Sequence, residues 1–211
     1  SAPLCPTGYT YDVNTQTCTL VETSLADCVP DINFDVTSTD WGALTTAVAW
    51  ENFFSSQPNS GTTTVTNFSL VGGRVQLSVS TSLTSLYLGS KNITNVSVIV
   101  INTMEELFLN ANNIVNFNPT ETLPTSLKRL TLGGNQIVTF NPTLALPEGL
   151  VTLFMTNNDI IEFNPTIPLP TTLENIYLGS NSITNFNPTL ALPTSLKILT
   201  ISGNQISTFN P

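Results

Sequence analysis

The side chains that most often carry catalysis are missing or badly placed in this sequence. It contains no histidine, so its many Ser and Thr hydroxyls and its cysteines have no imidazole to activate them. Neither a Gly-x-Ser-x-Gly nucleophile motif nor a Gly-rich phosphate-binding loop is present. Glu105 and Glu106 are adjacent, and neighbouring residues of a strand point to opposite sides, so these two carboxylates cannot work as an acid/base pair. We therefore expect a protein that is not an enzyme and that uses no cofactor or metal.

Composition narrows the remaining classes of protein. Charged residues make up only 9% of the 211 residues, and five Lys and Arg face fourteen Asp and Glu, giving a net charge of -9. Five cations cannot form the basic surface that nucleic acids require, so we expect no nucleic-acid partner. No apolar run reaches the roughly 18–20 residues that span a bilayer, so we expect no membrane insertion. The hydrophobic content of 40% is sufficient for a sizeable core.

Cysteines and glycosylation sequons offer covalent chemistry of another kind. Three cysteines permit one disulfide, either Cys5–Cys18 or Cys18–Cys28, with one thiol left over, or all three stay reduced. Three Asn residues stand in N-glycosylation sequons, which a host with the required enzymes would modify: Asn67, Asn92 and Asn95.

The dominant feature of the sequence is a repeat with a fixed period. The tripeptide Phe-Asn-Pro recurs every 23 residues, starting at Phe117, Phe140, Phe163, Phe186 and Phe209. Within a period, apolar residues recur in the pattern of Leu127, Leu130, Leu132 and Ile137. An Asn stands before the last of these positions in five repeats: Asn112, Asn135, Asn158, Asn181 and Asn204. Seven repeats can be aligned over residues 65-211, with starts at 65, 83, 104, 127, 150, 173 and 196.

The pattern L-x-x-L-x-L-x-x-N-x-I resembles that of the leucine-rich repeat family, and Leu127-Lys-Arg-Leu-Thr-Leu-Gly-Gly-Asn-Gln-Ile137 fits every position. The Leu-Pro-x-x-Leu entry to each strand is similar to that of bacterial and phage members. The resemblance implies an α/β-solenoid, mostly β, whose short parallel strands form a concave face. It also implies that each Asn turns inward and satisfies backbone groups at a bend. Two prolines in the return segment exclude a helix there, so we expect an extended or polyproline-like convex side with a stacked Phe column.

Two segments precede the repeats. Residues 40-54 place Trp41, Leu44, Val48 and Phe54 at helical spacing, so residues 31-64 are expected to form an N-terminal cap with one helix. Residues 1-30 are expected to form a Cys-containing hairpin that serves in attachment or assembly. The phrase Cys-Pro-x-Gly-Tyr-x-Tyr-Asp-x-x-Thr-x-x-Cys in this segment resembles openings found in structural proteins of tailed bacteriophages.

The strand position between two inward leucines is the candidate binding surface. It holds Ser69 in the first repeat and then Tyr87, Phe108, Thr131, Phe154, Tyr177 and Thr200. Four aromatic side chains that face solvent either shield one another across strands or contact a sugar or a partner protein. The repeat spacing also places Glu105 beside Lys128 and Glu174 beside Lys197, which predicts two exposed ion pairs.

These observations lead to two hypotheses on function. The first is a non-catalytic binding or assembly protein on an extracellular or virion surface, such as a phage fibre, spike or decoration component, whose concave face holds a partner protein or host glycan. The second is a purely architectural spacer attached through residues 1-30. The last repeat would leave an apolar rung uncovered, so we expect an oligomer or larger assembly in which the array continues or another subunit covers this rung. That rung consists of Leu196, Leu199, Ile201, Ile206 and Phe209.

Overall fold

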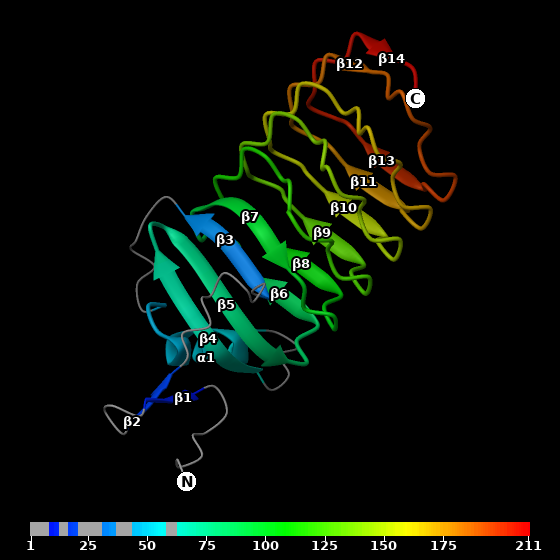
Figure 1. The fold of residues 1–211 in the computed structure, drawn as a ribbon. Helices are drawn as coiled ribbons and strands as arrows, with labels where there is room; N and C mark the ends of the chain where they lie inside the picture. Colours follow the sequence, from blue (N-terminus) through cyan, green and yellow to red (C-terminus); the bar gives the residue numbers. More distant parts are fainter. Residues whose placement is uncertain (1–8, 13–16, 21–30, 37–43, 58–62) are drawn as a thin grey trace.

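Residues 83–211 wind into a β-solenoid of about five turns, shown from green to red in Figure 1. The computed structural model describes residues 9–12, 17–20, 31–36, 44–57 and 63–211. This part of the chain is mostly β, with a single helix. The predicted solenoid of short parallel strands is therefore confirmed, and the N-terminal part of the chain departs from the prediction in three places described below.

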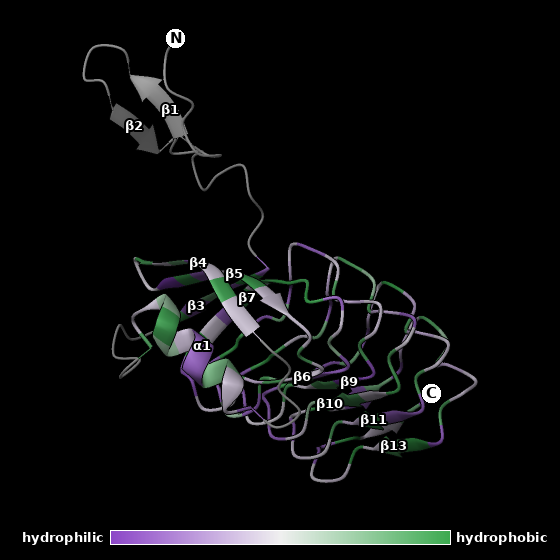
Figure 2. Cartoon of the chain, turned by 90° about the horizontal axis from the view of Figure 1, so that it is seen from below, coloured by the Kyte–Doolittle hydropathy of each residue, from purple (hydrophilic) through white to green (hydrophobic). Residues whose placement is uncertain are grey.

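One parallel sheet runs the length of the solenoid. Its strands lie in chain order, each paired with the next in register. Figure 2 shows them side by side along one flank of the solenoid, with the return segments on the other side. The strands are β6 (Ser85–Tyr87), β8 (Glu106–Phe108), β9 (Arg129–Thr131), β10 (Thr152–Phe154), β11 (Asn175–Tyr177) and β13 (Ile198–Thr200).

The middle residue of each of these strands points into the solenoid. Leu86, Leu107, Leu130, Leu153 and Ile176 are fully buried, whereas Leu199 in the last strand is only partly buried. The first and third residues of the same strands lie on the opposite side of the sheet, because side chains alternate along a strand. Most of them are at least partly exposed, but Ser85 and Thr152 are buried among their neighbours. Since the strands are in register, the solvent-facing residues form straight rows across the sheet.

After each strand the chain bends sharply at a residue with a positive φ angle. Gly134 and Gly203 supply the bend without strain, but Ser90, Ala111, Asn157 and Ser180 adopt the same left-handed conformation with φ of 54–56°. The next residue in five of these bends is the Asn of the repeat. The side chains of Asn112, Asn135, Asn158 and Asn181 are buried, and Asn204 is half-buried.

Each buried Asn links the bend of its own turn to the turn before it. The Oδ1 atom of Asn135 accepts a hydrogen bond from the backbone N–H of Ile114 at 3.0 Å. Its Nδ2 atom donates to the carbonyls of Leu109 and Leu132 at 3.0 and 2.9 Å. Asn158, Asn181 and Asn204 repeat this pattern. The amides thus satisfy backbone groups that the bend leaves without partners.

The return segments contain no helix within the described residues, as the prolines predict. Short parallel pairs hold neighbouring turns together, namely the bridges of Glu162 with Thr139 and Asn185, and strands β12 (Asn185–Phe186) and β14 (Thr208–Phe209). The rings of Phe140, Phe163, Phe186 and Phe209 stack at centroid distances of 6.1, 6.1 and 5.5 Å. Phe117 is buried at the start of the same column.

A four-stranded antiparallel sheet precedes the solenoid, in the order β4-β5-β3-β7. Its strands are β3 (Ile32–Val36), β4 (Thr63–Val71), β5 (Arg74–Thr81) and β7 (Ile93–Ile99), the last of which lies in the return segment of the first turn. The predicted first repeat, starting at residue 65, is therefore wrong. Gly72 and Gly73 both have positive φ angles, and a two-residue turn of this kind folds β4 back onto β5 as a hairpin.

The helix α1 (Ala47–Ser55) is shorter than the predicted helix at 40-54. It begins after Thr46, whose Oγ1 atom accepts a hydrogen bond from the backbone N–H of Ala49 at 3.1 Å. The predicted helical face is right at Phe54, which is buried, and wrong at Val48, which is 63% exposed, because the helix buries Trp50 instead. Residues 37–43, including Trp41, lie outside the described residues.

Two polar side chains on or just after α1 accept hydrogen bonds from backbone N–H groups of β6 and β4. The Oε1 atom of Gln57, just after the helix, accepts a hydrogen bond from the backbone N–H of Tyr87 in β6 at 2.9 Å. The Oε1 atom of Glu51 accepts one from the backbone N–H of Val65 in β4 at 2.8 Å. The sheet and the helix together share one hydrophobic core with the solenoid.

The N-terminal segment contains the expected hairpin. Strands β1 (Tyr9–Asp12) and β2 (Thr17–Leu20) pair antiparallel, with Tyr11 opposite Cys18. Cys5, Cys28 and the side chain of Cys18 lie outside the described residues, so the predicted disulfide alternatives stay predictions.

Candidate binding face

The solvent side of the parallel sheet, which we call the front face, carries three rows of side chains. The aromatic row consists of the third strand residues, Tyr87, Phe108, Thr131, Phe154, Tyr177 and Thr200. The central row consists of the first strand residues, Ser85, Glu106, Arg129, Thr152, Asn175 and Ile198. The edge row precedes the strands and consists of Thr84, Glu105, Lys128, Val151, Glu174 and Lys197.

The aromatic row contains two ring pairs separated by a threonine. Tyr87 and Phe108 stack with a centroid distance of 4.2 Å and an interplanar angle of 7°. Phe154 and Tyr177 approach to 4.9 Å with an angle of 36°. Thr131 lies between the pairs, and all four rings are half-buried. The structure thus brings together the predicted binding residues in one row, and it shows that the rings also pack on one another.

Glycine next to the aromatic row makes room for one of the rings. A Cβ atom at Gly133 would lie 3.4 Å from the Cδ1 atom of Phe154 and 3.1 Å from the carbonyl oxygen of Thr156. The Phe154 ring therefore lies close to Gly133, in the segment that follows β9.

Ion pairs occupy the other two rows. Lys128 Nζ lies 2.9 Å from Glu105 Oε1, and Lys197 Nζ lies 2.6 Å from Glu174 Oε1, so both predicted pairs are confirmed. A third pair, between Arg129 Nε and Glu106 Oε1 at 3.4 Å, was missed by the sequence analysis. Its signal is present in the sequence, because Glu106 and Arg129 have the same 23-residue spacing as the two predicted pairs.

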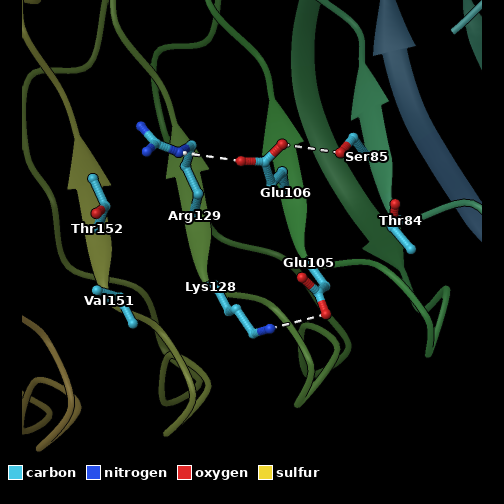
Figure 3. Close-up of a pocket in the computed structure, with 8 residues that line it drawn as sticks. All are labelled: Thr84, Ser85, Glu105, Glu106, Lys128, Arg129, Val151 and Thr152. Carbon is cyan, nitrogen blue, oxygen red and sulfur yellow. Dashed lines mark hydrogen bonds and ion pairs between the residues drawn. The ribbon is translucent and has the colours of Figure 1, made fainter. Parts of the chain in front are cut away.

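A shallow cleft of about 330 Å³ opens on the front face around two of these ion pairs (Figure 3). It is lined by Thr84, Ser85, Glu105, Glu106, Lys128, Arg129, Val151 and Thr152. The prediction that the Glu105 and Glu106 side chains point to opposite sides is therefore wrong, because Glu105 precedes β8 and does not follow the alternation of the strand. The lining comes from four neighbouring strands, with long charged side chains on or just before β8 and β9 and shorter side chains on or just before β6 and β10. The Oγ atom of Ser85 donates a hydrogen bond to Glu106 Oε2 at 2.9 Å, which holds the carboxylate on one wall.

The three sequon asparagines lie on or near the antiparallel sheet and differ in their surroundings. Asn67 on β4 and Asn92 before β7 are exposed. The Nδ2 atom of Asn95 on β7 donates to Asp35 Oδ2 at 3.1 Å and to Ser97 Oγ at 3.3 Å, so this amide already has partners. The acceptor Asp35 also receives a hydrogen bond from Arg74 Nε at 2.8 Å. This bond from Arg74 holds the pKa of the Asp35 carboxyl below its ordinary value of 3.8, against the opposing effect of partial burial.

The described residues contain no group of three or more His, Cys, Asp or Glu side chains placed to hold a metal ion. No helix in this part of the chain has both the length and the apolar character needed to cross a bilayer.

Comparison with protein-family models and with curated proteins finds no match to this chain. The site is therefore interpreted from its own geometry.

Proposed function

We propose that this chain is a non-catalytic binding protein whose front face contacts a partner protein or a glycan. We propose further that its solenoid is of the leucine-rich repeat type, covered at the first turn by α1 and the antiparallel sheet. It works on an extracellular or virion surface, within an oligomer or larger assembly. A low content of charge and many Thr, Asn and Ser residues suit such a location.

The observation that carries the proposal is the aromatic row. Four rings lie on the solvent side of a sheet, at positions where the fold requires no apolar side chain because the core is filled from the other side. Aromatic side chains grouped on an exposed surface are a common mark of an interaction site, because they bury a large apolar area with few rotatable bonds. Hydroxyl and charged groups in the adjacent rows supply directional contacts.

The stacking of the rings supports a second candidate function, that of an architectural spacer. Cross-strand aromatic pairs stabilise a sheet by about 0.5–1.5 kcal/mol each. If this is their whole role, the solenoid holds other parts of an assembly apart and the front face has no ligand.

A double substitution separates the two candidates. Phe108→Ser with Phe154→Ser removes one ring from each pair, and we expect it to lower binding by at least about tenfold while the melting temperature changes by only a few degrees. Binding is measured on an array of glycans and on an array of extracellular proteins, using the full chain.

The matched control is Val138→Ser with Ile161→Ser. These side chains are 37% and 53% exposed and lie outside the parallel strands, so the control removes exposed apolar surface away from the front face. We expect it to bind as the unmodified chain does. Unchanged binding by the Phe108/Phe154 variant, together with a large loss of stability, would establish the spacer instead.

A further inference from the structure

The cleft on the front face combines features that suit one class of ligand. It contains two carboxylates, one ammonium and one guanidinium, and each carboxylate is paired with one cation. Its formal charge is therefore zero, and no charge is left to be neutralised by a charged ligand. A charged ligand would find as its counterion only a group that already has a charged partner.

Hydrogen-bonding capacity remains on both sides of the cleft after these pairs have formed. Figure 3 shows the terminal nitrogen atoms of Arg129 pointing away from Glu106, and they have no hydrogen-bond partner among the described residues. The hydroxyl of Thr84 adds a group that both donates and accepts. A carboxylate oxygen with two lone pairs can accept a further bond beside the one it receives from Ser85 or Arg129.

An apolar surface lies on the same face as the cleft, next to its lining residues. Tyr87 and Phe108 lie two residues beyond Ser85 and Glu106 on the same strands, so the stacked pair forms the neighbouring row. A ligand that extends from the cleft across the central row would touch ionised groups at one end and aromatic carbon at the other.

We infer that this cleft is a subsite for a neutral sugar residue of a glycan. A pyranose carries hydroxyls that each donate and accept, which matches alternating carboxylate acceptors and guanidinium donors, and it has C–H groups that pack on aromatic carbon. The volume of about 330 Å³ lies at the lower end of the range of small-molecule sites, roughly 300–1,000 Å³, which suits a short part of an oligosaccharide.

Two other ligand classes fit less well. An acidic glycan would meet a chain of net charge -9 and cations that are already paired. A protein partner would have to bury four charged side chains, although the centres of protein interfaces are depleted of charged residues, Arg apart. The inference rests on the proposed function, since it names the ligand of the same face.

The test uses the full chain on an array of neutral oligosaccharides with sialylated and uronate-containing glycans as comparison, followed by titration with the neutral glycan that binds best. Glu106→Gln and Arg129→Gln each remove charged hydrogen-bonding groups from the cleft, and we expect each to weaken binding by about tenfold or more. The matched control is Glu174→Gln, which breaks the Glu174–Lys197 pair on the same face but outside the cleft, and which should change affinity less than twofold.

A charge-swapped variant distinguishes a loss of ligand contacts from a loss of stability. Glu106→Arg combined with Arg129→Glu restores an ion pair between the same two strands, so we expect an unchanged melting temperature, whereas neutral-glycan binding should stay weak because donors and acceptors have exchanged places. Binding only to acidic glycans, or neutral-glycan binding that none of the cleft variants weakens, would overturn the inference.

The array experiments also separate this inference from the proposed function. Suppose that no glycan binds, but that the Phe108→Ser/Phe154→Ser variant loses binding to a protein on the array of extracellular proteins. The sugar subsite is then wrong, and the proposal that the front face binds a partner is supported. If neither array yields binding that depends on the front face, both proposals are wrong.

Discussion

Two asparagines of one repeat, Asn158 and Asn164, hold their side-chain amides in opposite environments. Asn158 is buried, accepts a hydrogen bond from the backbone N–H of Ile137 at 3.0 Å, and donates to the carbonyls of Leu132 and Met155 at 3.0 and 3.2 Å. Asn164 is partly exposed, and its Oδ1 accepts bonds from the backbone N–H and the hydroxyl of Thr189 at 2.8 and 3.0 Å. Both amides join neighbouring turns, but water can replace only the second set of contacts.

We expect Asn158→Ala to lower the free energy of unfolding by about 1–2 kcal/mol more than Asn164→Ala. The reason is that the buried backbone groups of three residues would lose their partners, and an unsatisfied buried group costs about 1–3 kcal/mol. Urea unfolding of both variants, followed by circular dichroism, measures the difference. Equal destabilisation would mean that water reaches the bend at Asn158.

At the scale of elements, one ion pair joins two strands of the antiparallel sheet. Asp35 on β3 lies directly opposite Arg74 on β5, and the guanidinium donates to both carboxylate oxygens at 2.8 and 3.4 Å. The pKa of Asp35 is lowered mainly by this hydrogen bond, with a smaller contribution from Asn95. The ionised carboxylate is therefore favoured by folding, and the pair stabilises the sheet only while Asp35 is charged.

This lowered pKa predicts a direction for the pH dependence of stability. The contribution of Asp35 is complete above its unfolded pKa, near 3.9, and is lost as the pH falls through the lower folded value. We expect Asp35→Asn to show a smaller loss of unfolding free energy than the unmodified chain between pH 5 and pH 2. Arg74→Gln should reduce the acid dependence in the same way, because it removes the group that lowers the pKa. A fall in Asp35→Asn as steep as in the unmodified chain would contradict the assignment.

The elements that could be predicted from the sequence are those that repeat. Each of the middle turns packs between two turns of the same kind, so one period predicts the strand, the bend with its Asn, and the Phe column. The hairpin of β4 and β5 does not repeat along the chain. Its apolar residues have nearly the spacing of a repeat, and only the two-residue turn at Gly72-Gly73 distinguishes it from one. The start of α1 depended on Thr46, a cap that the apolar spacing of residues 40-54 does not single out.

The front face was predicted to a similar extent. Alternation along each strand was enough to place the aromatic row, and the 23-residue spacing was enough to predict two ion pairs. The cleft was not predicted. Its lining comes from four neighbouring strands, through Ser85, Glu106, Arg129 and Thr152, and the pattern of a single repeat does not bring these residues together.

At the scale of the whole molecule, the solenoid is a stack in which each turn contacts only its neighbours. Its two ends differ. The first turn is closed by Gln57 and by the antiparallel sheet. In the last turn, Leu196, Leu199, Ile201 and Ile206 are only partly buried and Phe209 is 53% exposed. Equivalent side chains in the middle turns, from Leu127 to Phe163, are all buried. Stability should therefore fall towards the last turn.

Hydrogen exchange at two equivalent amides measures this gradient. The backbone N–H of Gln136 donates to Ile114, and that of Gln205 donates to Ile183, each at 3.0 Å. Both glutamines follow an Asn, so their intrinsic exchange rates are closely matched. We expect Gln205 to exchange at least about tenfold faster, which corresponds to about 1.4 kcal/mol less free energy of local opening. Because the two hydrogen bonds are equal in length, the difference would come from the weaker burial of the last turn. Equal protection of Gln136 and Gln205 would instead show that another copy of the chain covers this turn in solution, and a change of the Gln205 rate with protein concentration would identify that contact directly.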